Sequence, residues 1–80
     1  MKYVYLLESI SNPSKRYIGI TRNLSSRLKE HNAGKSPHTA KFKPWKLVVA
    51  IRFADHKKAE AFEKYLKAGS GHAFAKRHFW

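Results

Sequence analysis

The sequence predicts a small α+β sandwich, an α/β fold in which helices flank a three-stranded, mainly antiparallel sheet in the order ββαβαα. Two short segments rich in aromatic and β-branched residues follow each other closely, which predicts a hairpin. A longer apolar run predicts a third strand, and two stretches with apolar residues three and four apart predict helices. We expect one domain over residues 1–80, since 80 residues have room for a single core.

The first two strands are expected at residues 3–8 and 16–20. Both segments are dominated by aliphatic and aromatic side chains, and residues 9–14 between them contain the turn-forming pair Asn12-Pro13. The separation is short enough for the strands to pair as an antiparallel hairpin. This hairpin places Tyr5 and Tyr17 on adjacent strands.

The first long helix is expected to begin after Asn23 and to run to about Asn32. Asn23 suits the capping position, and Leu24 and Leu28 lie four apart, on one face of the helix. Gly34 provides a stop signal. Residues 35–44 contain prolines, hydroxyl residues and basic residues, which predicts an exposed loop.

The third strand is expected at residues 45–53, the most apolar run of the chain. Its nearly continuous hydrophobicity predicts a central strand that is covered on both faces. A second helix should follow, capped by Asp55, with an apolar face formed by Ala59, Phe62 and Leu66. Gly69 is expected to end this helix, and residues 70–80 to form a short third one.

The charge of the chain indicates a polyanionic partner. Lys and Arg total 17 against five acidic residues, which gives a formal net charge of +12. The chain is too apolar and aromatic for a disordered basic tail, and no apolar run has membrane-spanning length. With no cysteine there is no disulfide framework, so we expect a cytoplasmic protein. The positive charge leads us to expect that it binds nucleic acid rather than membranes.

Two tyrosine motifs give the chain a resemblance to a known family. Tyr3-Val4-Tyr5, followed by Tyr17-Ile18-Gly19, an Arg at position 27 and a Glu at position 63, resembles the ordered motif set of the GIY-YIG nuclease superfamily. The resemblance spans nearly the whole chain. Within the superfamily, the chain is similar to the N-terminal nuclease domain of excision-repair endonucleases. Two departures are visible: Tyr3 and Val4 replace Gly and Ile of the first motif, and no residue clearly matches the asparagine that many members carry near the C-terminus.

The resemblance implies a metal-dependent endonuclease that hydrolyses phosphodiester bonds, with DNA the more probable substrate than RNA. It implies that Glu63 binds Mg²⁺ or Mn²⁺, because a single carboxylate with waters and a phosphate is a normal Mg²⁺ site. Arg27 is expected to hold a phosphate oxygen in bidentate fashion. Tyr5 is expected to accept the proton of the attacking water, if nearby cations lower its pKa, and Tyr17 to position the scissile phosphate.

Each of these residues also has a purely structural interpretation. Glu63 has the spacing for an exposed ion pair with Lys67. Arg27 lies four residues before His31, so both project from one side of the helix, but a lone helix arginine is usually solvated. His31 suits a catalytic role and a cationic role near the helix C-terminus equally well. Both tyrosines also suit simple packing within strands.

Further residues are candidates for contacts that position the nucleic acid without reading its sequence. They are Gly19, Lys35, Lys41, Lys43, Lys46, Lys76 and Arg77. We expect Trp45 to pack in the core and Trp80 to fray, so base stacking is not predicted. The five histidines lack the spacing of a zinc site.

Two hypotheses follow. The first is an endonuclease or nickase that acts with Mg²⁺ or Mn²⁺ and no small-molecule cofactor. The second is a catalytically inactive, basic nucleic-acid-binding module on the same scaffold. A basic RNA-associated protein is a third reading, but it leaves the motif order to chance. Family members usually carry separate binding domains, so a protein partner that supplies specificity is also expected.

Overall fold

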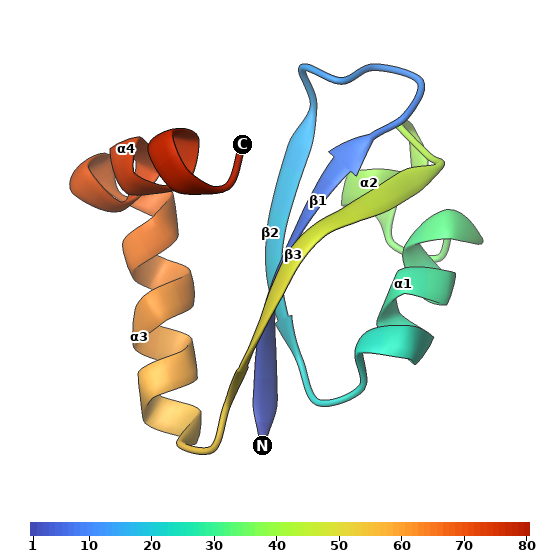
Figure 1. Ribbon diagram of the computed structural model, residues 1–80. Coiled ribbons are helices and arrows are strands. Elements are labelled where there is room, and N and C mark those ends of the chain that lie inside the picture. The colour runs from blue at the N-terminus through green and yellow to red at the C-terminus, as the bar shows by residue number, and fades with distance from the viewer.

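The computed structural model describes residues 1–80 and consists of a three-stranded antiparallel sheet with helices on both faces (Figure 1). The strands are β1 (Lys2–Ser9), β2 (Arg16–Thr21) and β3 (Trp45–Phe53). The helices are α1 (Leu24–Asn32), α2 (Pro37–Ala40), α3 (His56–Lys67) and α4 (Gly69–His78). The predicted class and the predicted order ββαβαα are confirmed, with the short α2 added between α1 and β3.

The central strand is β1, and the prediction that residues 45–53 form it is wrong. The strand order is β2-β1-β3, so β3 pairs with β1 alone and lies at one edge. Residues Val4 to Leu7 of β1 are at most 1% exposed, whereas β3 leaves Lys46 and Leu47 exposed. The apolar run of β3 reflects the helices that pack on it from both sides, which an edge strand also permits.

The alternation of side chains along β1 divides the core into two halves. Val4 and Leu6 pack with Ala59, Leu66 and Ala75 on the face covered by α3 and α4. Tyr5 and Leu7 pack with Trp45 on the opposite face, which α1 and α2 cover (Figure 1). Successive residues of a strand point to opposite faces, so one strand supplies both halves. Tyr5 and Tyr17, the catalytic candidates of β1 and β2, therefore lie on the face that α1 and α2 cover.

The boundaries of α1 are those that its sequence predicts. The side chain of Asn23 accepts a hydrogen bond from the backbone N–H of Ser26 at 3.0 Å. Gly34 has a φ of 79°, which ends the helix in a conformation that favours glycine. This confirmed helix presents Arg27 and His31 toward the sheet.

The predicted loop at residues 35–44 contains the helix α2, which the sequence analysis missed. Ser36 and Pro37 open it, and Pro37 occupies a position where the missing N–H carries no penalty. Thr39 is 1% exposed, and its carbonyl accepts a 2.8 Å hydrogen bond from the indole of Trp45. The segment is therefore anchored in the core on one side and carries its lysines on the other.

Helix α3 begins after Asp55, the capping residue that the sequence predicts. Asp55 accepts hydrogen bonds from the N–H groups of Lys57 and Lys58 at 2.8 and 3.2 Å. Ala68 is extended, with φ −96° and ψ 171°, and separates α3 from α4. Gly69 thus begins α4 instead of ending α3. None of the helices has the length and apolar character needed to cross a membrane.

The C-terminal residue Trp80 is not frayed, contrary to the expectation from its position. Its backbone N–H donates to the carbonyl of Ala75 at 2.9 Å. Its half-buried ring packs against the core half that contains Leu66, and the Arg16 guanidinium lies 4.8 Å from the ring centroid. The packing against α3 and β2 fixes this side chain next to the hairpin.

Candidate active site

Three buried side chains from different elements form a hydrogen-bonded chain on the α1 face of the sheet. The Tyr5 phenol oxygen lies 2.9 Å from Nε2 of His31, and Nδ1 of His31 lies 2.7 Å from Oγ1 of Thr39. All three residues are at most 1% exposed. Buried polar groups are stable only when they are paired, so β1, α1 and α2 are tied together here.

The geometry favours one direction for the protons in this chain. The Thr39 hydroxyl also lies 3.5 Å from the carbonyl of Ser36, to which it can donate. Thr39 then accepts from Nδ1 of His31, and Nε2 accepts from the hydroxyl of Tyr5. This direction gives each of the three protons an acceptor and assigns His31 the neutral form with its proton on Nδ1.

Tyr17 and Gly19 of β2 complete the cluster. The ring of Tyr17 lies 4.9 Å from that of His31 and 6.2 Å from that of Tyr5, between centroids. Gly19 is paired with Tyr5 across the sheet, and a Cβ atom at Gly19 would lie 2.4 Å from the Tyr5 oxygen. The space above Gly19 is therefore taken by the Tyr5 side chain, whose close approach requires a glycine at this position.

Arg27 lies beside this cluster at the surface. The nearby phenol of Tyr5, together with Glu30, raises the pKa of the Arg27 guanidinium above its ordinary value. Nη1 of Arg27 lies 3.0 Å from the Glu30 carboxylate, and the Arg27 side chain is 38% exposed. A charged, partly exposed guanidinium beside two phenols suits the binding of a phosphate.

Burial raises the pKa of Tyr5, and Arg27 offsets this effect only in part. Arg27 thus lowers the pKa of Tyr5, as expected, but by less than burial raises it. A fully buried phenol that stays protonated and donates to His31 is a poor acceptor for a water proton. Tyr5 is better described as a positioning residue, and Tyr17, which is partly exposed, is the phenol available to a substrate.

His31 is not a solvated cation at the end of α1. Burial lowers its pKa, and the charge of Arg27 lowers it further. Its ring is 0% exposed, and both ring nitrogens are hydrogen-bonded within the protein. Between the two roles left open by the sequence, the structure thus excludes the helix-end cation and leaves a neutral imidazole that orients Tyr5.

Glu63 lies on α3, on the face of the sheet opposite the tyrosine cluster (Figure 1). Its side chain is 16% exposed, and its carboxylate forms an ion pair with Lys67 at 2.5 Å. This is the i,i+4 pair that the spacing allowed. Arg27, Tyr5 and His31 therefore converge, while Glu63 reaches the same region only around the edge of the sheet formed by β2.

A hollow of about 350 Å³ lies at this edge. Tyr17 from the tyrosine cluster and Lys67, the ion-pair partner of Glu63, both line it. A larger hollow of about 590 Å³, between the start of α1, Tyr3 and Leu47, contains none of the predicted catalytic residues. The edge of β2 is therefore where a phosphate could meet residues from both faces.

The residues at this edge fit a divalent ion only in an open, partly hydrated site. No group of three or more His, Asp or Glu side chains is close enough to hold a metal ion. Glu63 alone offers a mostly buried carboxylate, whose charge is balanced by the mobile ammonium of Lys67. Mg²⁺ is commonly bound by one or two carboxylates, with water and substrate phosphate completing its shell. Glu63 fits that pattern.

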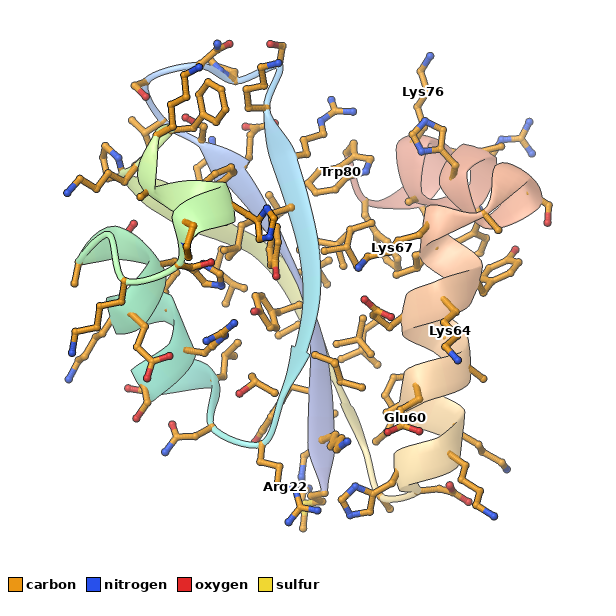
Figure 2. All side chains as sticks on the ribbon, turned by 180° about the vertical axis from the view of Figure 1, so that it is seen from behind. Arg22, Glu60, Lys64, Lys67, Lys76 and Trp80 are labelled. Carbon is orange, nitrogen blue, oxygen red and sulfur yellow. The ribbon has the colours of Figure 1, made fainter.

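The basic residues predicted to contact nucleic acid are spread over the surface. Lys35, Lys41 and Lys43 lie between α1 and β3, and Lys46 pairs with Glu8 at 3.3 Å. Lys76 and Arg77 lie on α4, where Lys76 points away from the sheet (Figure 2). These residues do not form one patch, so they surround the molecule with positive charge instead of marking a single track.

The sequence analysis missed Thr39 and the role of Asn32. Asn32 accepts a hydrogen bond from the N–H of Trp45 at 2.6 Å and donates one to its carbonyl at 3.2 Å. These bonds fix the start of β3 against α1. A threonine inside a Pro-containing segment carries no sequence signal for burial. Its role becomes visible only when α2 is packed beside His31.

Comparison with known proteins places this geometry in a family. Residues 1–76 match the family described as the GIY-YIG catalytic domain. The structure-specific endonuclease subunits SLX1 of Debaryomyces hansenii and Candida dubliniensis are 35% and 37% identical to the chain, over 94% of it. The SLX1 homolog of Giardia intestinalis is 35% identical over 61% of the chain.

The chain corresponds to only a part of these relatives. It spans 22%, 27% and 14% of their lengths, respectively. The family match, in contrast, covers both tyrosine motifs, Arg27 and Glu63. The chain therefore belongs to the GIY-YIG catalytic domain family of nucleases.

Proposed function

We propose that the chain is the nuclease domain of a metal-dependent endonuclease that acts on DNA. The observation that carries this proposal is the arrangement at the edge of β2. Tyr17 belongs both to the cluster with Tyr5 and His31 and to the hollow that Lys67 lines beside Glu63. A phosphodiester bound at this edge would meet the Tyr17 phenol, with the Glu63 carboxylate behind Lys67 on one side and Arg27 beside the tyrosine cluster on the other.

The chain's own residues supply charge and orientation. Arg27 holds the phosphate and offsets the negative charge that develops on its oxygens. Tyr17 orients the phosphate or the attacking water through its hydroxyl, while Tyr5 and His31 hold the cluster rigid from below. Glu63 would hold Mg²⁺ or Mn²⁺, which supplies Lewis acidity when bound.

The relatives support an endonuclease that acts together with another subunit. Their names describe subunits of structure-specific endonucleases, and the chain's net charge of +12 suits any nucleic acid backbone. The basic residues are dispersed, which suits backbone contacts that carry no sequence information. We therefore infer that a partner or a further segment directs the domain to its substrate.

Nicking of supercoiled plasmid tests this proposal. The wild-type domain should convert the plasmid to open circles with Mg²⁺ or Mn²⁺ and should stop when EDTA is added. Glu63→Gln should reduce the rate by about 100-fold or more, because the metal contribution is worth several kcal/mol. The matched control is Glu60→Gln, which removes a carboxylate from the same helix that pairs with Lys2 and is 54% exposed.

The inactive binding module is the competing function. It predicts that wild type and Glu63→Gln bind DNA equally and that neither produces open circles. If that result is obtained on plasmid, branched and single-stranded DNA with both metals, the domain is a binding module. If Glu60→Gln loses as much activity as Glu63→Gln, Glu63 is not the metal ligand.

A further inference from the structure

The hollow at the edge of β2 has two kinds of wall. Ile18 and Leu66 form an apolar floor, and Trp80 provides an aromatic side. Arg16, Lys67 and His72 provide polar, basic sides. A small, partly apolar space with a few cationic groups fits a flat, apolar ligand that carries negative charge.

Trp80 and Arg16 are stacked on this wall. The Arg16 guanidinium lies over the Trp80 ring, 4.8 Å from its centroid. Trp80 is fixed by its backbone hydrogen bond to Ala75 and by packing against the core. An aromatic ring and a guanidinium held in this way are the groups on which nucleobases stack.

The hollow lies next to the residues of the proposed cleavage site. Tyr17 lines it, and Lys67 links it to the Glu63 carboxylate. Figure 2 shows that Lys67 on α3 and Trp80 after α4 both reach toward β2. Its volume of about 350 Å³ is at the small end of ligand sites, which suits one nucleotide and not a base pair.

We propose that this hollow binds one unpaired nucleotide next to the scissile phosphate, with its base stacked on the Trp80–Arg16 pair. The inference rests on the proposed function and specifies its substrate as DNA with an unpaired nucleotide adjoining a duplex. A base within a duplex is stacked on its neighbours and does not enter so small a space. Lys67 is the cationic group of the hollow that is left to meet a flanking phosphate.

DNA binding in EDTA tests the proposal without requiring catalysis. Fluorescence anisotropy would compare a labelled duplex with a single-stranded flap, the same DNA with abasic positions at the flap junction, and a blunt duplex. The wild type should bind the normal flap more tightly than the abasic flap and the blunt duplex. Trp80→Ala should weaken binding of the normal flap by about tenfold and leave the other two unchanged. Trp80→Phe should retain most of the binding.

Tyr65→Ala is the matched control, because Tyr65 is an aromatic residue of the same helical layer, 40% exposed, that does not line the hollow. It should bind all three DNAs like the wild type. The comparison of normal and abasic flaps uses the wild type alone, so it decides the question even if Trp80→Ala does not fold. Equal binding of those two flaps would overturn the proposal.

The result is separable from that of the proposed function. If the flap preference is present but no metal supports nicking, the nucleotide site stands and the nuclease proposal fails. If plasmid is nicked with a Glu63-dependent rate while Trp80→Ala binds and cuts like the wild type, the nuclease stands and the nucleotide site is refuted.

Discussion

The phenol of Tyr5 donates a hydrogen bond to His31 across 2.9 Å in the interior of the protein. Both groups are buried, and His31 is held in turn by Thr39 at 2.7 Å. This geometry favours a positioning role for Tyr5, and its assignment as the proton acceptor stays a prediction. The phenol at position 5 is buried within the cluster, and the phenol at position 17 is the partly exposed one.

Thr39→Val should destabilise the protein, because it leaves Nδ1 of His31 buried without a partner. The expected loss is about 1–3 kcal/mol in the free energy of unfolding. Urea denaturation followed by circular dichroism would measure it. Thr39→Ser retains the hydroxyl and serves as control. A valine variant as stable as the serine variant would show that the His31–Thr39 bond contributes nothing.

The free energy of unfolding should decrease as the pH is lowered, and His31 should contribute to this decrease. Burial lowers the pKa of His31 in the folded state, so below the unfolded value of about 6.5 the unfolded chain binds a proton that the folded protein does not. The free energy of unfolding should thus decrease as the pH drops below about 6.5, until the folded-state pKa is reached.

Denaturation at pH 7.5 and pH 5.5 would measure this effect on wild type and His31→Gln. The variant should be less stable at the higher pH and show a smaller decrease between the two values. His78→Gln, which removes an exposed histidine, should keep the wild-type decrease. An unchanged decrease in His31→Gln would assign the pH dependence to other groups.

Gly19→Ala should destabilise the protein and lower nuclease activity. Its Cβ would lie 2.4 Å from the Tyr5 oxygen, so Tyr5 or the hairpin must shift. Overpacking of this kind typically costs about 1–3 kcal/mol. Gly69→Ala is the control, because no atom lies within 4 Å of its added Cβ. Thermal unfolding should show a lower Tm for the first variant alone, and equal Tm values would contradict the close contact.

Tyr17→Phe and Tyr5→Phe should separate catalysis from stability. Tyr17→Phe removes the hydroxyl of a partly exposed tyrosine. We therefore expect an activity loss of about 100-fold with a nearly unchanged unfolding curve. Tyr5→Phe removes the donor to His31 and should reduce stability by about 1–3 kcal/mol. Nicking rates and urea denaturation of the same preparations would test the pair. The reverse pattern would restore Tyr5 as the reacting phenol.

Local patterns determined much of this protein. The aromatic and aliphatic residues of 3–8, the caps Asn23 and Asp55 and the stop at Gly34 predict the elements, because each signal depends on residues close together in the chain. The ordered tyrosine motifs identified the family, which the match over residues 1–76 confirms.

Tertiary packing alone decided the rest. The apolar runs of β1 and β3 are alike in sequence, and only their partners make β1 central. The burial of Thr39, the separation of Glu63 from Arg27 by the sheet and the fixed position of Trp80 each depend on elements far apart in the chain. Such contacts follow from how the layers fill space together, which the spacing of residues along the sequence does not encode.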